Sequence, residues 1–160
     1  PGIQFRDVST LLHDGPAFRR TIDRMVALVD PASFDLIAGI EARGFIVSAA
    51  LSYALEKGKV MLRKPGKLPG KSVFIDYALE YGTDRIEMHV DAILPGQRVL
   101  LVDDLLATGG TAMAAVQLLR GQGATVEQAL FIVDLPDLGG AEKLAAAGVT
   151  PASLMAFAGD

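Results

Sequence analysis

Two adjacent carboxylates, Asp103 and Asp104, follow directly on an unbroken apolar run, Val99–Val102. Such a run is typical of a strand that is buried on both faces, as in parallel sheets. The two acids would then lie at the carboxyl end of the strand, which is the edge where open α/β sheets bind ligands. Adjacent carboxylates repel each other and are costly to bury unless they are satisfied. A sugar diol or a divalent cation would satisfy them.

A glycine-rich turn follows the acid pair and leads into a segment that is rich in helix formers, Ala112–Arg120. The turn consists of Ala107, Thr108, Gly109, Gly110 and Thr111. Two glycines before a helix let backbone N–H groups turn inward, and the helix dipole adds positive potential, so we expect a phosphate there. A phosphate cradle beside a diol acceptor describes a site for a ribose 5-phosphate. The alternative is a solvated acidic turn with an ordinary helix N-cap, which the combination of strand, acid pair and turn disfavours.

Two further loops carry charges that could meet a polyanion. The segment Glu41–Gly44 lies between an expected strand and an expected helix, so it would face the same ligand edge. The segment Arg63–Lys71 holds four basic residues and no acid, which suits a polyanion but would also suit a solvated loop. Within it, Gly66–Ser72 is one residue short of a Walker A motif and contains Pro69, so we reject a P-loop.

The elements that must position these loops alternate along the chain. Apolar runs and helical periodicity predict strands at 34–40, 59–62, 73–77, 85–90, 99–102, 126–133 and 152–157, and helices at 14–30, 45–57, 112–120 and 141–147. This alternation predicts an α/β fold with a doubly wound, mainly parallel five-stranded sheet and flanking helices. The strands at 73–77 and 85–90 would form a hairpin that stands off the sheet with no helix to pack on, and residues 1–12 would be an extended loop.

Composition narrows the class of protein. The 160 residues are enough for one domain with a proper core. They are 51% hydrophobic, yet no apolar run approaches the roughly 20 residues that span a membrane, and no signal-peptide pattern is present. The absence of cysteine excludes disulfides, thiolate metal sites and cysteine nucleophiles, and it permits a cytoplasmic location. A net charge of −4 without a long basic block argues against nucleic acid as a partner. His13 and His89 are too isolated to suggest a metal pair.

Five segments, in this order, resemble the type I phosphoribosyltransferase family, and within it the adenine-specific members. They are Gly2–Asp7, Gly39–Phe45, Arg63–Gly70, Tyr77–Gly82 and Val102–Thr111. The resemblance covers nearly the whole chain and implies a single domain, 1–160. It further implies a flexible β-hairpin flap at about 71–90 and a small hood formed by residues 1–12 and about 135–160. Members of the family often hold a non-proline cis peptide in the loop after Ile40. They also usually carry a short helical segment ahead of the point where this chain begins, so we expect one before Pro1.

The resemblance implies a purine salvage reaction in which adenine and phosphoribosyl pyrophosphate give AMP and pyrophosphate. Positive charge would develop on the sugar as the pyrophosphate leaves. We expect Mg²⁺, held mainly by substrate and water with no firm protein ligand. We also expect a cytoplasmic homodimer that works on small molecules and binds neither nucleic acid nor membranes.

The roles implied for individual residues follow the same resemblance. Asp103 and Asp104 would hold the ribose hydroxyls beside the developing cation, and residues 107–111 would hold the 5-phosphate. Pyrophosphate would meet Glu41, Ala42, Arg43, Arg63, Lys64 and Lys67, some of them in the neighbouring subunit's site. Adenine would be bound by Gln4, Phe5, Arg6, Arg43 and Leu135. Glu80, on the flap, would exchange a proton with the base.

Two rival functions share these motifs. One is a phosphoribosyltransferase for hypoxanthine, guanine or xanthine, which the segments Phe5–Asp7 and Leu79–Tyr81 disfavour. The other is a non-catalytic sensor of phosphoribosyl pyrophosphate, which would have little use for Glu80 on a flap.

Overall fold

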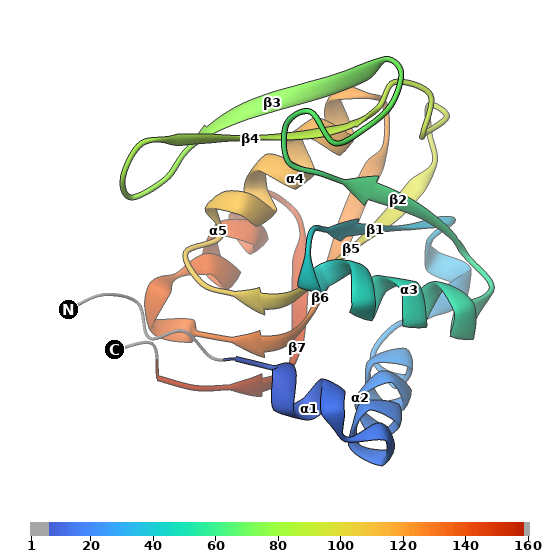
Figure 1. The fold of residues 1–160 in the computed structure, drawn as a ribbon, viewed down its shortest axis with the longest axis vertical. Coiled ribbons are helices and arrows are strands. Elements are labelled where there is room, and N and C mark those ends of the chain that lie inside the picture. The colour runs from blue at the N-terminus through green and yellow to red at the C-terminus, as the bar shows by residue number, and fades with distance from the viewer. Residues whose placement is uncertain (1–6, 159–160) are drawn as a thin grey trace.

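The computed structural model describes residues 7–158, in which a five-stranded sheet is covered by helices on both faces (Figure 1). The sheet has the order β2-β1-β5-β6-β7, and all neighbouring strands are parallel. Its strands are β1 (Leu36–Ile40), β2 (Gly58–Leu62), β5 (Arg98–Leu106), β6 (Thr125–Asp134) and β7 (Thr150–Ala156). The helices are α1 (Ser9–His13), α2 (Gly15–Ala27), α3 (Arg43–Leu55), α4 (Gly110–Gly121) and α5 (Gly140–Ala146), with short 3₁₀ turns at Pro31–Ser33 and Pro136–Leu138. The prediction of a parallel five-stranded α/β fold is therefore confirmed.

Successive residues of the central strands point into two separate cores. Leu101 and Phe131 pack on one side with α4 and α5, while Leu100 and Leu130 pack on the other side with α2 and α3. All four side chains are fully buried. A strand that is buried on both faces has no polar alternation, which explains the continuous apolar runs in the sequence.

Among the boundaries that differ from the sequence prediction, two concern α1 and β5. Residues 9–12 were expected to be part of an extended loop, but they form α1, because the Asp7 carboxylate accepts hydrogen bonds from the Ser9 backbone N–H (3.0 Å) and hydroxyl (2.7 Å). Strand β5 was expected to end before the acid pair, but it continues to Leu106. Its pairing with β6 extends to the partners Leu106 and Asp134, so Asp103 and Asp104 lie within the last part of the strand.

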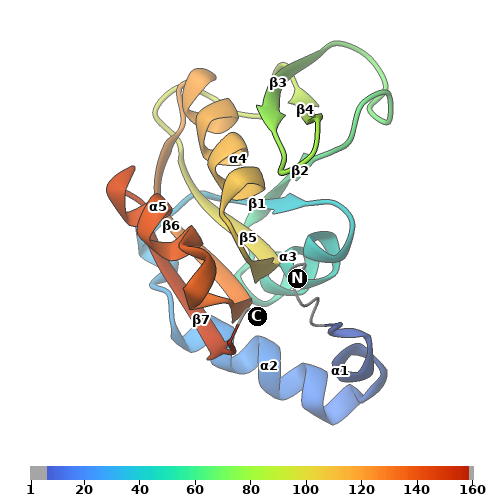
Figure 2. The same ribbon diagram turned by 90° about the vertical axis from the view of Figure 1, so that its left-hand side faces the viewer.

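The antiparallel hairpin of β3 (Ser72–Ala78) and β4 (Thr83–His89) lies beside α4 (Figure 2). We expected it to stand clear of any helix, and this is wrong. Ile86 and Met88 are fully buried in the core that contains α4, and Val73 and Ile75 pack against it. The alternating apolar residues of the two strands form one face that needs such a cover. One face of the hairpin thus packs on the core that contains α4.

An arginine at the amino end of β5 holds the segment that precedes β1. Arg98, at the start of β5, donates to both carboxylate oxygens of Asp35 (3.2 and 2.9 Å) and to the carbonyl of Ala32 (2.9 Å). These bonds hold the pKa of Asp35 down at about 2. They lie at the opposite end of β5 from the acid pair. Within residues 7–158, no helix is long and apolar enough to cross a membrane.

Candidate active site

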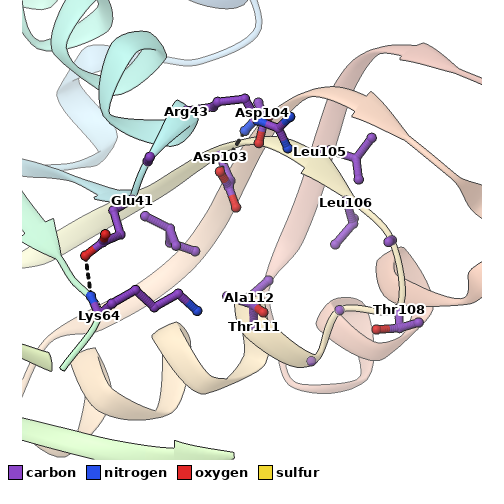
Figure 3. Close-up of a pocket in the computed structure, with 15 residues that line it drawn as sticks. Glu41, Arg43, Lys64, Asp103, Asp104, Leu105, Leu106, Thr108, Thr111 and Ala112 are labelled. Atoms are coloured by element: carbon purple, nitrogen blue, oxygen red, sulfur yellow. Dashed lines mark hydrogen bonds and ion pairs between the residues drawn. The ribbon is translucent and has the colours of Figure 1, made fainter. Parts of the chain in front are cut away.

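A pocket of about 270 Å³ lies where β1 and β5 end and α4 begins (Figure 3). It brings together most of the residues predicted for the site, namely Glu41, Ala42, Arg43, Lys64, Asp103, Asp104, Ala107, Thr108, Gly109, Gly110 and Thr111. Three separate strand-to-helix or strand-to-loop junctions contribute to it, because parallel strands end at a common edge. The charged segments and the glycine-rich turn that the sequence analysis identified therefore lie around one pocket.

The acid pair forms one wall of this pocket. The Asp104 side chain is only 6% exposed, and its Oδ2 lies 2.8 Å from Nε of Arg43 at the start of α3. Asp103 Oδ1 accepts a hydrogen bond from the Asp104 N–H at 2.9 Å. Burial, and then the charge of Asp104, raise the pKa of Asp103 well above its ordinary value. Asp104 is thus paired with a cation, whereas the half-buried Asp103 has no cation that outweighs the effect of desolvation on its pKa.

Glycine at position 44 makes room for Asp103. A Cβ at this position would lie 2.6 Å from Asp103 Oδ1, which is closer than real Cβ atoms come to a neighbour. Helix α3 can therefore start directly against the carboxylate only because residue 44 has no side chain. The same helix start supplies Arg43, so the position of both acids depends on this close approach.

The glycine-rich turn leaves the first backbone N–H groups of α4 open to the pocket. Gly109 caps the helix with φ +83° and gives no side-chain capping bond, and no acidic residue lies in the first turn. The turn also packs tightly on α5, because a Cβ at Gly109 would lie 3.0 Å from the Cα of Gly140 and a Cβ at Gly140 would lie 2.5 Å from the Ala107 carbonyl. Uncapped N–H groups at a helix start attract anions, so the turn has the chemistry of the phosphate cradle that the sequence predicts.

The Glu41 carboxylate is bonded to residues of the basic loop, Arg63–Lys71. Its carboxylate is 8% exposed, with Lys67 Nζ at 2.8 Å and Arg63 Nε at 3.5 Å, and it accepts a hydrogen bond from the Lys64 backbone N–H. Burial alone would raise the pKa of Glu41, but the bonds from Lys67 and Lys64 outweigh it, and the pKa is lowered. The peptide between Glu41 and Ala42 is cis, as the resemblance implied.

Lys64 is the basic residue of this loop that lines the pocket. Its side chain extends across the pocket toward Thr111 at the start of α4 (Figure 3). Burial would lower the pKa of Lys64, but its hydrogen bond to Asp84 raises it, so the ammonium stays charged. Arg63 and Lys67 are not among the lining residues and are engaged with Glu41 instead.

The remaining predictions concern residues that the structure either does not describe or does not place in the pocket lining. Gln4, Phe5 and Arg6 lie outside the described residues. Glu80 is exposed in the hairpin turn, where the Leu79 N–H donates to the Gly82 carbonyl at 3.0 Å, and it does not line the pocket. Leu135 was expected against the adenine face, but its side chain is fully buried in the core beside α2 and α3.

The side chains around the pocket limit how the expected Mg²⁺ could be bound. Residues 7–158 contain no group of three or more His, Cys, Asp or Glu side chains that could hold a metal ion. Asp104 already faces Arg43, which leaves Asp103 as the main carboxylate available to a cation or to a sugar hydroxyl. Mg²⁺ commonly binds through one or two carboxylates while it keeps water and phosphate oxygens as its other ligands. The site therefore fits a metal that arrives with its substrate.

Sequence reasoning missed two hairpin residues that contact a pocket-lining residue. Tyr77 and Asp84 are register partners in β3 and β4, and both contact Lys64. Tyr77 belongs to a segment that was singled out for Glu80, while Asp84 was assigned to the turn. The signal that could have identified them is the alternation of the two strands, which places both residues on the face that packs toward α4.

Comparison with known proteins first defines the class. Residues 9–143 match the family model of the phosphoribosyl transferase domain. The adenine phosphoribosyltransferase of Azorhizobium caulinodans is 60% identical over 159 residues, which cover 99% of this chain and 89% of that protein.

Solved structures agree with this match. The crystal structure of adenine phosphoribosyltransferase from Thermoanaerobacter pseudethanolicus superposes with a TM-score of 0.93 at 46% identity, over 98% of this chain and 90% of that chain. The enzyme from Saccharomyces cerevisiae superposes with a TM-score of 0.88 at 36% identity, over 96% and 88% of the two chains. The chain belongs to the phosphoribosyltransferase family, and within it to the adenine phosphoribosyltransferases.

Proposed function

We propose that this chain transfers the phosphoribosyl group of phosphoribosyl pyrophosphate to adenine, which gives AMP and pyrophosphate. The observation that carries the proposal is the pocket itself, where the acid pair lies opposite the uncapped start of α4. A diol acceptor and a phosphate cradle in one pocket suit the two ends of a ribose 5-phosphate. The yeast relative, 36% identical to this chain, has been crystallised with adenine and D-2,5-dideoxy-2,5-imino-altritol 1,6-bisphosphate.

The acid pair would act on the sugar. Asp104, oriented by Arg43 and almost completely buried, would accept a hydrogen bond from one ribose hydroxyl. Asp103, with its raised pKa, would share a hydrogen bond with the other hydroxyl. Both lie where positive charge develops on the sugar as the bond to pyrophosphate breaks, and a fixed negative charge beside that centre stabilises the transition state.

The leaving pyrophosphate would be met by cations on the other side of the pocket. Lys64 supplies a charged ammonium at the pocket wall. Glu41 would serve as a positioning residue for the basic loop, because its buried carboxylate contacts Lys64, Lys67 and Arg63. Mg²⁺, bound to pyrophosphate oxygens, water and at most Asp103, would neutralise further negative charge on the leaving group.

The adenine end of the site would involve residues 4–6, Leu135 and Glu80. Adenine offers an N6 donor and an N1 acceptor, and hypoxanthine reverses this pattern. We propose that backbone groups near residues 4–6 and 135 recognise this arrangement of donor and acceptor, while Glu80 exchanges a proton with the base. A hydrogen-bonding site that meets the reversed pattern leaves buried groups unpaired, and such sites discriminate by roughly 10⁴-fold or more.

We further propose that the chain acts as a homodimer in the cytoplasm. Strand β2 is an edge of the sheet, and apolar side chains are exposed on it and on the neighbouring helix α3. Ile46 is 44% exposed, Tyr53 is 90% exposed and Met61 is 41% exposed. A second copy of the chain would cover this surface. It would also bring the two basic residues that do not line the pocket, Arg63 and Lys67, close to the neighbouring subunit.

Incubation of the protein with phosphoribosyl pyrophosphate, Mg²⁺ and each purine in turn tests the proposed reaction. We expect AMP and pyrophosphate from adenine, and a kcat/KM for hypoxanthine that is lower by roughly 10⁴-fold. Comparable values for the two bases would refute the backbone mechanism of base selection. Binding of phosphoribosyl pyrophosphate without turnover of any purine would indicate the sensor instead.

A further inference from the structure

A hydroxyl on the hairpin joins two residues that line the pocket. The Tyr77 hydroxyl lies 3.4 Å from Lys64 Nζ, 3.4 Å from the Thr111 hydroxyl and 3.2 Å from Asp84 Oδ2. Lys64 and Thr111 line the pocket, whereas Tyr77 and Asp84 belong to β3 and β4. None of the roles derived above uses Tyr77 or Asp84.

The hydrogen-bonding capacity of this hydroxyl is fully used. A tyrosine hydroxyl has one proton to donate and can accept two hydrogen bonds. Tyr77 donates to Asp84 and accepts from Lys64 and from Thr111. Asp84 is fixed in turn, because its Oδ1 accepts the Arg85 N–H at 2.8 Å and its Oδ2 also pairs with the Lys64 ammonium. A group that satisfies three partners at once sets the position of each of them.

The Lys64 ammonium keeps one donor for a ligand. It carries three N–H groups, of which Asp84 and Tyr77 take two. Its side chain is 36% exposed and lines the pocket, so the third N–H is available to an anion there. The neighbouring register pair, Asp76 and Arg85, offers a contrast. Its bidentate ion pair (2.6 and 3.0 Å) involves exposed side chains and reaches none of the pocket-lining residues.

We propose that Tyr77 and Asp84 are positioning residues for phosphoribosyl pyrophosphate. They hold the Lys64 ammonium, proposed as a ligand of pyrophosphate, and the Thr111 hydroxyl, proposed as a ligand of the 5-phosphate, so that one hairpin sets the position of a ligand for each anionic group of the substrate. The inference rests on the proposed function of Lys64 as a pyrophosphate ligand. It assigns to the strands of the hairpin a role in binding that is separate from any role of Glu80 in its turn.

Tyr77→Phe is the primary test, because it removes the hydroxyl without changing charge or the packing of the ring. We expect KM for phosphoribosyl pyrophosphate to rise by roughly threefold to tenfold, the range for one lost hydrogen bond, while kcat stays within about twofold. Calorimetry with inorganic pyrophosphate should show a similar loss of affinity, and the thermal unfolding midpoint should change little. Asp76→Asn, which changes a side chain of the same hairpin that reaches no pocket-lining residue, serves as the control and should stay within about twofold of wild type. An unchanged KM in Tyr77→Phe would overturn the proposal.

A double-mutant cycle with Lys64→Ala separates this inference from the function on which it rests. If Tyr77 acts through Lys64, adding Tyr77→Phe to Lys64→Ala should weaken pyrophosphate binding by less than about twofold further. If Lys64→Ala alone binds pyrophosphate like wild type, the assignment of Lys64 fails. If Lys64→Ala weakens binding and Tyr77→Phe still adds its full effect, Lys64 is a ligand but Tyr77 does not position it.

Asp84→Asn and Asp76→Asn form a matched pair, because each removes one negative charge and one ion pair from the same hairpin. We expect Asp84→Asn to raise KM for phosphoribosyl pyrophosphate several-fold and Asp76→Asn to leave it within about twofold. A lowered KM in Asp84→Asn would mean that Asp84 withholds Lys64 from the ligand, which contradicts the proposal.

Discussion

Glu80 is a single residue whose position in the structure does not by itself indicate the catalytic role proposed for it. It lies in the hairpin turn, outside the pocket, so a catalytic role requires the turn to close on bound base. A group that acts in the transition state alone changes rate without changing substrate affinity.

We therefore expect Glu80→Gln to lower kcat by roughly two orders of magnitude, the usual contribution of a positioned proton-transfer group. Affinity for phosphoribosyl pyrophosphate and thermal stability should remain nearly unchanged. Steady-state kinetics and direct binding on one preparation measure both quantities, and Asp76→Asn on the same hairpin is the control. If kcat of Glu80→Gln stays within about threefold of wild type, the activation barrier has changed by less than roughly 1 kcal/mol. The hairpin turn would then only cover the site.

Asp103 is the residue whose charge state should respond most to binding. Its raised pKa means that the folded, ligand-free protein favours the protonated carboxyl more than the unfolded chain does. That contribution to stability is complete below the unfolded pKa of about 4 and is lost as pH rises through the folded-state pKa.

Asp103→Asn should accordingly gain thermal stability relative to wild type as pH is raised from about 5 to about 8. Unfolding midpoints of the two ligand-free proteins across this range measure the difference. Asp76→Asn is again a useful control, because its hydrogen bond from Arg85 lowers the pKa of Asp76 and the trend should be weak or opposite. A difference that is independent of pH would contradict the raised pKa of Asp103.

At the scale of the element, the two glycines before α4 have different tasks. Gly109 has φ +83° and touches α5, so a side chain there is strained whatever ligand is present. Gly110 belongs to the helix, and a Cβ on it would meet its nearest neighbour, the Ala78 carbonyl, at an ordinary 3.8 Å. The sequence alone treated the two positions as equivalent.

We expect Gly110→Val to weaken phosphoribosyl pyrophosphate binding while the fold is retained, because the side chain would stand where the phosphate must approach the backbone. Gly109→Val should instead lower the thermal unfolding midpoint as well. Calorimetric titration and thermal unfolding on both variants distinguish these outcomes. Full affinity in Gly110→Val would remove the basis for the phosphate cradle.

Local patterns were sufficient for most elements and for the main pocket. The apolar runs at 99–102 and 126–133 identified buried strands, and the acid pair and Ala107–Thr111 identified the ligand edge. Features that depend on tertiary packing were beyond their reach. The hairpin's contact with α4, the burial of Leu135 and the links from Tyr77 and Asp84 to Lys64 all join segments that are distant in sequence. Side-chain direction at such joints is set by the partner element, which a single segment does not encode.

At the scale of the whole molecule, the exposed apolar side chains on α3 and β2 lead to a test of assembly. Tyr53→Glu places a charge on the surface proposed for the second copy. We expect wild type to be dimeric in light scattering and Tyr53→Glu to dissociate at concentrations at least tenfold higher, since burial of an unpaired charge is costly. Lys143→Glu, on α5, is the matched control. A wild-type protein that is monomeric throughout would contradict the proposed dimer.

The contact between the phosphate-binding turn and α5 also has an evolutionary consequence. A Cβ at Gly109 would lie 3.0 Å from the Gly140 Cα, and a Cβ at Gly140 would lie 2.5 Å from the Ala107 carbonyl, so a side chain at either position meets main-chain atoms that a substitution elsewhere does not remove. Substitutions at these two positions should therefore be poorly tolerated. Other positions of α5 can vary, but these two should remain glycine. A library that randomises both should return glycine at each among its functional members.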